Sequence, residues 1–231
     1  ELDVQLSRDG RVVVHHDYRL NTGYAPDPGD AWIDGPGPRI KDLPLEALRR
    51  FDIGRPRPGS DYAQAYPTLV PQDGATLPSL AEVIECVRAA PGFLLLVELK
   101  SGLSDDSADP VTLADAALRV VRDADFLERV VFVGFDWRGL VRVHAQAPQA
   151  RLWFSTDEKI PGDPALFAMI GAAGGLGWFA HFSALTAERA AQARAAGLEL
   201  AAWTVNDPAQ MARLAALGID ALCTDRPDLL P

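Results

Sequence analysis

Cysteine and positive charge are both scarce in this sequence of 231 residues, which has two cysteines and 22 Lys or Arg against 32 Asp or Glu. The cysteines form neither a CxxC pair nor a zinc-ligand pattern, which argues against a zinc site. The formal charge of −10 and the lack of a basic run interleaved with aromatics argue against binding to nucleic acid. No apolar run approaches the roughly 18–20 residues that span a bilayer.

The two cysteines do not identify a cellular compartment. Cys86 lies in a helical pattern and Cys223 in a strand pattern, so we expect two buried free thiols rather than a disulfide. The sequence begins with Glu1 instead of Met, and no signal peptide is visible. We expect a periplasmic or extracellular location in preference to a cytoplasmic one.

Residues 1–17 predict a β-hairpin that ends in two histidines. The apolar residues of 1–6 alternate with Glu1, Asp3 and Gln5, so this stretch is predicted to be a strand with one apolar face. A turn at 7–10 and a β-branched return strand at 11–15 follow. Residues 18–77 contain long Gly- and Pro-rich loops around a short helix near 45–51, and long irregular segments of this kind are usually lids or binding loops.

From Pro78 onward, predicted strands and helices alternate. Ser79 caps the first helix, and Glu82 stands at capping-box spacing from it. Alternation of this kind implies parallel strands joined by helical crossovers. The expected strands span 93–100, 130–135, 150–154, 177–182, 198–205 and 219–224, and the later helices span 110–124, 139–147, 163–170, 187–196 and 208–217.

The strand count favours an α/β fold of the (β/α)8 TIM-barrel type. The first strand and the six listed above make seven, and the hairpin return is extra, so one strand of a barrel is not accounted for. A barrel unit averages about 30 residues. We therefore expect one domain over 1–231 whose first βα unit is missing from the supplied sequence. The competing architecture is an open doubly wound sheet, but neither GxGxxG nor a Walker-type lysine is present.

Charged residues recur at i and i+2 on two of the predicted strands. Glu1 and Asp3 face the same side of the first strand, and Glu98 and Lys100 repeat this spacing on the next long strand. Three carboxylates converging at a barrel mouth form an all-oxygen site, which Mg²⁺ or Ca²⁺ prefers. From spacing alone, an alternative has the same weight as a metal site. In that alternative Glu98 and Lys100 form a structural ion pair, and Glu1 and Asp3 belong to an exposed terminus.

His16 and Trp203 are further candidates. His16 follows the strand that pairs with the one bearing Glu1 and Asp3, and a histidine beside a metal-bound phosphate is a natural proton donor or acceptor. A lone histidine is more often structural, and His15, His144 and His181 have weaker claims. Trp203 ends a strand where barrel active sites gather, so it either walls a substrate slot or packs in the core. Asn206 follows the same strand end, and its alternative role is to cap the helix that begins after it.

Five motifs in order resemble the glycerophosphodiester phosphodiesterase family over almost the whole chain. The first two are Glu-Leu-Asp-Val-Gln-Leu-Ser-Arg-Asp-Gly with its His-His-Asp, and the Thr-Leu-Pro-Ser-Leu-Ala-Glu segment at 76–82. The others are Val-Glu-Leu-Lys at 97–100, Trp-Thr-Val-Asn at 203–206, and Gly-Ile-Asp at 218–220 with Thr-Asp-Arg-Pro at 224–227.

The resemblance implies a role for each candidate. Glu1, Asp3 and Glu98 are the implied ligands of one divalent cation, Mg²⁺ or Ca²⁺. His16 is implied as one of two catalytic histidines, Lys100 as a catalytic residue that binds a phosphate oxygen, and Trp203 as a wall of the glycerol slot. The family hydrolyses small-molecule glycerophosphodiesters to sn-glycerol 3-phosphate and an alcohol. Residues 18–77 resemble its inserted segment over the active site.

The chain also departs from the family pattern. The first strand with His-Arg-Gly and the following Pro-Glu-Asn-Thr are absent, and Gly-Phe-Asp at 134–136 replaces the frequent Ser-Phe-Asp. We interpret the first absence as trimming of this sequence. One rival is a phospholipase D-type toxin of the sphingomyelinase class, against which Glu98 and residues 203–206 argue. A non-catalytic rival is a binding barrel that lost catalysis with its first unit. The alcohol moiety and the oligomeric state stay open.

Overall fold

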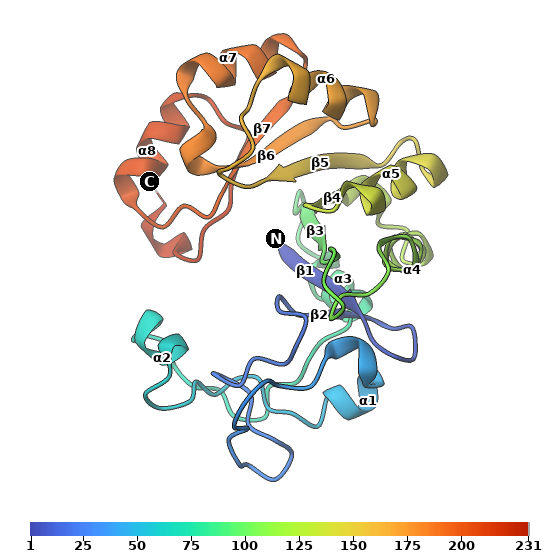
Figure 1. Ribbon diagram of the computed structural model, residues 1–231, viewed down its shortest axis with the longest axis vertical. Coiled ribbons are helices and arrows are strands. Elements are labelled where there is room, and N and C mark those ends of the chain that lie inside the picture. Colours follow the sequence, from blue (N-terminus) through green and yellow to red (C-terminus); the bar gives the residue numbers. More distant parts are fainter. Residues whose placement is uncertain (231) are drawn as a thin grey trace. The chain divides into compact units, whose positions relative to one another are not determined.

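The computed structural model describes residues 1–230, which group into two compact units (Figure 1). The first unit contains Glu1, Leu94–Leu99 and the chain from Leu127 onward, and the second contains Leu2–Phe93 and Lys100–Phe126. The strands are β1 (Leu2–Leu6), β2 (Val12–Val14), β3 (Leu95–Leu99), β4 (Val130–Gly134), β5 (Arg151–Thr156), β6 (Gly177–His181), β7 (Glu199–Trp203) and β8 (Ala221–Leu222). The helices are α1 (Leu45–Leu48), α2 (Asp61–Ala65), α3 (Leu80–Arg88), α4 (Pro110–Asp123), α5 (Trp137–Gln146), α6 (Pro164–Ala172), α7 (Ala187–Ala195) and α8 (Pro208–Ala216), with 3₁₀ turns η1 (Ile40–Asp42), η2 (Leu127–Arg129), η3 (Phe182–Ala184) and η4 (Pro227–Leu229).

The first unit is a parallel sheet with helical crossovers. Strands β3 to β8 pair in parallel, each with the next, and helices α5 to α8 connect β4 to β8. Figure 1 shows α6 and α7 along one side of strands β5 to β7. Three of these helices, α5, α6 and α8, have an aspartate as N-cap, whose side chain accepts a hydrogen bond from a backbone N–H of the first turn. The capping residues are Asp136, Asp163 and Asp207. The strands and helices therefore alternate as the sequence predicts, and aspartate caps mark where three of the helices begin.

The core of this unit lies where neighbouring strands present side chains to one face of the sheet. Its buried members come from β4, β5, β6 and β7, namely Val131, Val133, Trp153, Phe179 and Ala201. Glu199 receives hydrogen bonds from the indole N–H of Trp153, at 2.6 Å, and from the Arg151 guanidinium, at 3.0 Å. These bonds form a polar network at the start of β5 and β7.

The second unit begins with the predicted hairpin. Strands β1 and β2 are antiparallel, with Val4 opposite Val14, and the Lys100 N–H donates to the Val4 carbonyl at 3.1 Å. The capping box of α3 forms as predicted, because Ser79 and Glu82 exchange side-chain-to-backbone hydrogen bonds. Helices α3 and α4 pack against the hairpin.

Residues 18–77, which we call the irregular segment, have a hydrophobic core of their own. Aliphatic side chains from its loops and short helices are buried there together with Val13 of β2, namely Leu20, Ile40, Leu45, Leu48 and Leu77. The segment is also tied to the loop after β3. Arg19 makes two hydrogen bonds to Asp106, at 2.7 and 2.9 Å, and Lys41 donates to the Ser107 carbonyl at 3.0 Å. The segment is therefore a packed body that contacts the loop following Lys100.

The structure corrects three details of the sequence analysis. Residues 52–77 are not loop throughout, because Ser60 caps the short helix α2. The prediction of two buried thiols is wrong for Cys86, which is exposed on α3 opposite the face that carries Leu80 and Ile84; Cys223 is half-buried, and both are free. The pattern of the helix at 139–147 also predicts a surface position for His144, and the structure differs. Its ring is half-buried against Gly174, where an added Cβ would lie 2.4 Å from the ring.

The predicted elements otherwise form. All seven main strands and the hairpin return are present, with β8 the shortest. The prediction of a single domain over 1–231 stays a prediction. Among residues 1–230, no helix combines the length and apolar character that crossing a bilayer requires.

Candidate active site

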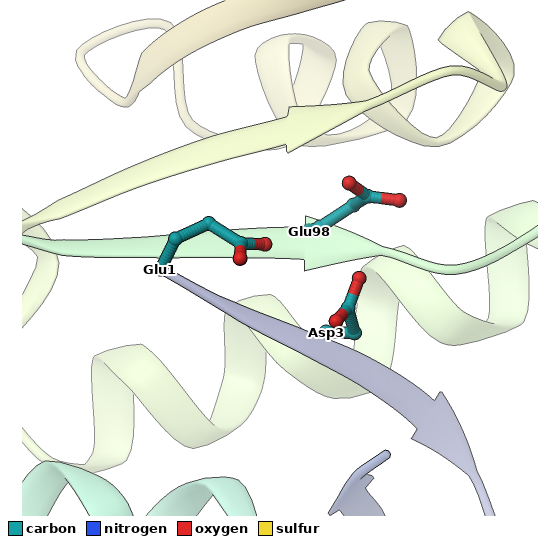
Figure 2. A group of neighbouring side chains, drawn as sticks. All are labelled: Glu1, Asp3 and Glu98. Carbon is teal, nitrogen blue, oxygen red and sulfur yellow. The ribbon is translucent and has the colours of Figure 1, made fainter. Parts of the chain in front are cut away.

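Three carboxylates gather beside strands β1 and β3 (Figure 2). Glu1 precedes β1, Asp3 lies on it and Glu98 lies on β3; one oxygen from each falls within 4.8 Å of the others. The period of two along a strand explains why Glu1 and Asp3 point the same way. Glu98 is only 7% exposed, and a carboxylate is rarely buried unless it is paired or bound to a cation. The predicted cluster is thus assembled.

The donor set of this cluster fits a hard divalent cation. Mg²⁺ and Ca²⁺ bind oxygen ligands at about 2.0–2.6 Å, so two ligands of one ion lie at most about 5 Å apart. The carboxylate oxygens satisfy that limit. Like charges this close repel unless a cation or a proton neutralises them. No histidine or thiolate belongs to the described cluster, which disfavours a softer metal.

Lys100 and His16 lie next to Asp3. The Lys100 ammonium is 3.5 Å from an Asp3 oxygen and 3.2 Å from Nε2 of His16. The Lys100 side chain is 15% exposed, whereas that of His16 is 66% exposed. Because an ammonium group can only donate, the contact requires Nε2 of His16 to accept, which leaves the proton of the neutral ring on Nδ1. Two of the predicted catalytic residues are therefore in mutual contact.

Asp17 orients the His16 ring. Nδ1 of His16 lies 2.7 Å from Asp17 Oδ1, and the Asn21 amide donates to the other Asp17 oxygen at 2.9 Å. The bond to Asp17 raises the pKa of His16 above its ordinary value, although burial and Lys100 oppose the change. The same bond lowers the pKa of Asp17. The bond to Asp17 thus orients the ring and favours its protonation, whereas the contact with the Lys100 ammonium favours the neutral ring.

A buried glutamine fixes the backbone that carries His16. The Gln5 side chain, on the polar face of β1, donates to the carbonyls of His15 at 2.9 Å and His16 at 3.3 Å, and also to that of Asp17. Gln5 is 3% exposed, and the Asp17 carbonyl also lies 2.8 Å from Nδ1 of His15. The strand that carries Asp3 therefore also positions His16.

His15 differs from His16 in burial, in hydrogen-bond partners and in the direction in which its pKa is shifted. Its ring is buried, with Nδ1 2.8 Å from the Asp17 carbonyl and Nε2 3.2 Å from the Tyr24 hydroxyl. A carbonyl can only accept, so Nδ1 carries the proton and Nε2 accepts from Tyr24. Burial lowers the pKa of His15 below its ordinary value. His15 is a neutral structural residue in this arrangement.

Trp203 stands in an aromatic cluster of the first unit. At the end of β7 its ring packs edge to face against Phe135, which follows β4, at 5.0 Å, and against His181, which ends β6, at 5.1 Å. Its indole N–H is buried and has no hydrogen-bond partner among residues 1–230. Asn206 does not cap α8, because Asp207 does; Asn206 instead bonds Thr224 and Asp225.

Sequence reasoning missed several members of these clusters. Asp17 was noted only as the neighbour of His16, and Gln5, Asn21, Tyr24 and Phe135 were given no role. The position of Gln5 was predictable, since it continues the i, i+2 pattern of Glu1 and Asp3 along the polar face of β1. The positions of Asn21 and Tyr24 were not predictable, because these residues come from an aperiodic stretch.

An alternating αβ fold that carries clustered carboxylates, a lysine and a histidine is typical of enzymes of the (β/α)8-barrel class. Residues 1–229 match the model of the glycerophosphoryl diester phosphodiesterase family. The chain belongs to this family, and both the fold class and the resemblance inferred from the sequence are confirmed.

Similar proteins agree with this assignment. A glycerophosphodiester phosphodiesterase of Caldanaerobacter subterraneus subsp. tengcongensis is 28% identical over 230 residues, which cover 100% of this chain and 83% of that protein. A crystal structure from Silicibacter pomeroyi, assigned as a glycerophosphoryl diester phosphodiesterase, superposes with a TM-score of 0.90 at 28% identity, covering 99% of this chain and 80% of that one. A phosphodiesterase of Oleispira antarctica, solved with the product sn-glycerol-3-phosphate, gives a TM-score of 0.75 at 26% identity, covering 98% and 80%.

Proposed function

We propose that the protein hydrolyses glycerophosphodiesters to sn-glycerol 3-phosphate and an alcohol, with one divalent cation held by Glu1, Asp3 and Glu98. The observation that carries the proposal is the contact chain from this carboxylate cluster through Lys100 to His16. Membership of the family supports the reaction, and the product bound in the Oleispira antarctica protein supports the glycerol phosphate half of it.

Each residue of the chain has a task in this reaction. When bound, the cation supplies positive charge that polarises a phosphoryl oxygen. Lys100 binds a second phosphoryl oxygen and offsets the charge that develops there. The bond between phosphorus and the alcohol oxygen breaks as water attacks phosphorus, so the attacking water gives up a proton to solvent and the leaving oxygen takes one up. If a glycerol hydroxyl attacks first, the product is a cyclic phosphate, and water then opens it to glycerol 3-phosphate. His16, whose pKa is raised by Asp17, gives the leaving oxygen its proton as general acid.

Residues from the rest of the chain complete the proposal. Trp203 walls the slot for the glycerol carbons, an assignment supported by its packing with Phe135 and His181 at the strand ends. The irregular segment caps the active site, which its contacts with the loop after Lys100 support. Asn21 and Asp17 orient the imidazole that must reach the leaving oxygen.

Metal removal tests the proposal directly. The full chain is assayed for release of glycerol 3-phosphate from a glycerophosphodiester, after exhaustive chelation and after addition of Mg²⁺ or Ca²⁺ in turn. We expect chelation to abolish the release and one ion to restore it. Glu98→Gln should lower kcat/KM by more than about 100-fold, the upper range for losing a residue that merely supports a ligand.

The exposed Glu46→Gln on α1 makes the same chemical change outside the cluster and should have no effect. Release of glycerol 3-phosphate that survives chelation would rule out the cation. No release under any condition from a folded protein would rule out the reaction.

A further inference from the structure

One face of the sheet in the first unit carries the core cluster, and the same face continues to the ends of the strands. Residues two apart along a strand point to the same side. Ser155 on β5 lies two positions beyond Trp153, which belongs to the core cluster. His181 on β6 lies two positions beyond Phe179, another of its members, and Trp203 on β7 packs against the cluster. We call the side that bears these residues the inner face.

Three polar atoms on the inner face have no hydrogen-bond partner among residues 1–230. Ser155 is 2% exposed, and its Oγ makes no hydrogen bond. The indole N–H of Trp203 is likewise buried and unpaired. Nε2 of His181 has no partner either, since the hydrogen bonds of this ring use Nδ1. A buried polar atom without a partner costs free energy, so a bound molecule that pairs with these atoms would stabilise the arrangement.

Ser183 determines which nitrogen of His181 carries the proton. The Ser183 backbone N–H donates to Nδ1 at 3.4 Å, and the Ser183 hydroxyl lies 2.8 Å from the same atom. Because Nδ1 accepts, the proton of the neutral ring is on Nε2. His181 and Trp203 are paired residues of neighbouring strands, and their ring centroids are 5.1 Å apart. The two unpaired N–H donors therefore belong to rings that are in contact.

The register of the sheet places Glu98 on the inner face as well. Glu98 lies two positions beyond Leu96, which packs against the core cluster, and it pairs with Val133 of β4. Phe135 comes two positions after Val133, and its ring packs against Trp203 at 5.0 Å. Glu98, Phe135 and Trp203 thus lie towards the carboxyl ends of strands of one parallel sheet, where the active sites of barrel enzymes gather.

We propose that Ser155, His181 and Trp203 bind the terminal hydroxyl of the glycerol arm of the substrate. This inference rests on the proposed hydrolysis of glycerophosphodiesters and names residues that recognise the substrate in it. One alcohol group has two acceptor lone pairs and one proton. It accepts from the imidazole and indole N–H groups and donates to Oγ of Ser155, so a single hydroxyl pairs all three atoms. None of the three side chains is charged when the imidazole is neutral, which suits a hydroxyl better than a phosphate oxygen.

Two substrates that differ by one hydroxyl test the assignment. One is a glycerophosphodiester, and the other is the matching ester of propane-1,2-diol, which lacks the terminal hydroxyl and keeps the hydroxyl next to the phosphate-bearing carbon. We expect kcat/KM for the first to exceed that for the second by about 2- to 12-fold for each hydrogen bond that the terminal hydroxyl makes. Ser155→Ala and His181→Phe should each lower this ratio, because each removes one partner of the hydroxyl.

Thr112→Ala is the control, since it removes an exposed hydroxyl on α4 that bonds to Asp109. The ratio in this variant should equal that of the unmodified protein. A ratio near one in the unmodified protein would overturn the assignment. A ratio that neither Ser155→Ala nor His181→Phe lowers would overturn it too, because the hydroxyl would then act through another group.

A binding measurement separates failure of this subsite from failure of the reaction. The product sn-glycerol 3-phosphate is titrated into the protein, and the indole N–H signal of Trp203 is followed by NMR, with inorganic phosphate as the comparison. We expect a saturable shift that Ser155→Ala weakens and that phosphate does not reproduce. Such a shift supports the subsite even when neither ester is hydrolysed, in which case only the proposed function is lost. Hydrolysis of both esters with the indole signal unmoved would mean that a resident water satisfies the three atoms, which overturns the subsite and leaves the proposed function intact.

Discussion

The two units of the molecule build their cores in different ways. In the first unit the side chains of one core cluster come from alternate positions of neighbouring parallel strands, as with Val131 and Val133 on β4, a strand that is buried at every position. In the irregular segment, Leu20, Ile40 and Leu77 come from loops and turns with no common period, yet each is at most 1% exposed. Burial therefore does not depend on regular secondary structure, and the polar network around His16 lies in the unit with the less regular backbone.

The largest expected effect tests whether His16, in the second unit, transfers the proton. His16→Ala should lower kcat by roughly 10²–10⁴-fold, the usual range for a general acid–base residue. His15→Ala should leave kcat much closer to normal and act on stability instead, because its buried ring bonds only to the Asp17 carbonyl and Tyr24 in the neutral state. Steady-state kinetics and thermal unfolding of both variants distinguish the two roles. Equal losses of kcat would mean that His16 has no special task.

A matched pair of leucines tests whether the two cores are equally solid. Leu48 lies in the core of the irregular segment and Leu152 lies on β5, and both are fully buried. Each Leu→Ala change should lower the free energy of unfolding by about 2–5 kcal/mol, the range for buried leucines. Chemical denaturation monitored separately in each unit, by hydrogen exchange, gives the two values. A loss below about 1 kcal/mol for Leu48→Ala would show that the irregular segment packs loosely.

The difference between the units also explains what the sequence could predict. Strands β3 to β8 and their helices follow from apolar periodicity and from caps such as Asp163–Pro164, and these cues depend only on local sequence. Helix α2 was missed because its five residues carry no apolar face, and none of them is buried. Cys86 was misplaced although the helical period, with Leu80 and Ile84 on the apolar stripe, puts residue 86 on another face of α3.

The candidate site was predictable where spacing determines direction. Glu1, Asp3 and Glu98 follow from the period of two and from the meeting of strand ends, and the structure brings them together. Asp17, Asn21 and Tyr24 act through hydrogen bonds whose partners are set by the fold of an aperiodic loop. Such partners depend on the three-dimensional path of the backbone, for which the sequence offers no period.

Helix caps provide a smaller test of the same comparison. Ser79 caps α3 in the second unit with a reciprocal bond from Glu82, whereas Thr186 caps α7 in the first unit without one. Ser79→Ala should cost about 1–2 kcal/mol and Thr186→Ala about 0.5–1 kcal/mol, within the known range for caps. Urea denaturation measures both. Equal values would show that the capping box adds nothing beyond the hydroxyl.

The smallest expected effect, a difference in titration between His15 and His16, compares buried and exposed surroundings one residue apart. By NMR in the presence of chelator, the pKa of His15 should lie below the ordinary value of 6.5 because its ring is buried, and that of His16 above it because Asp17 accepts its Nδ1 proton. The stability of the protein then depends on pH in opposite senses at the two histidines. The His15 contribution is complete above pH 6.5 and is lost as the pH falls through its lowered pKa. The His16 contribution is complete below pH 6.5 and is lost as the pH rises through its raised pKa.

Asp17→Asn tests the cause of the His16 shift. The variant keeps an oxygen beside Nδ1 but removes the charge, so it should lower the pKa of His16 and abolish the loss of stability as the pH rises. If His16 titrates at the same pH in Asp17→Asn as in the unmodified protein, Asp17 does not set its protonation, and the general-acid assignment loses its electrostatic basis.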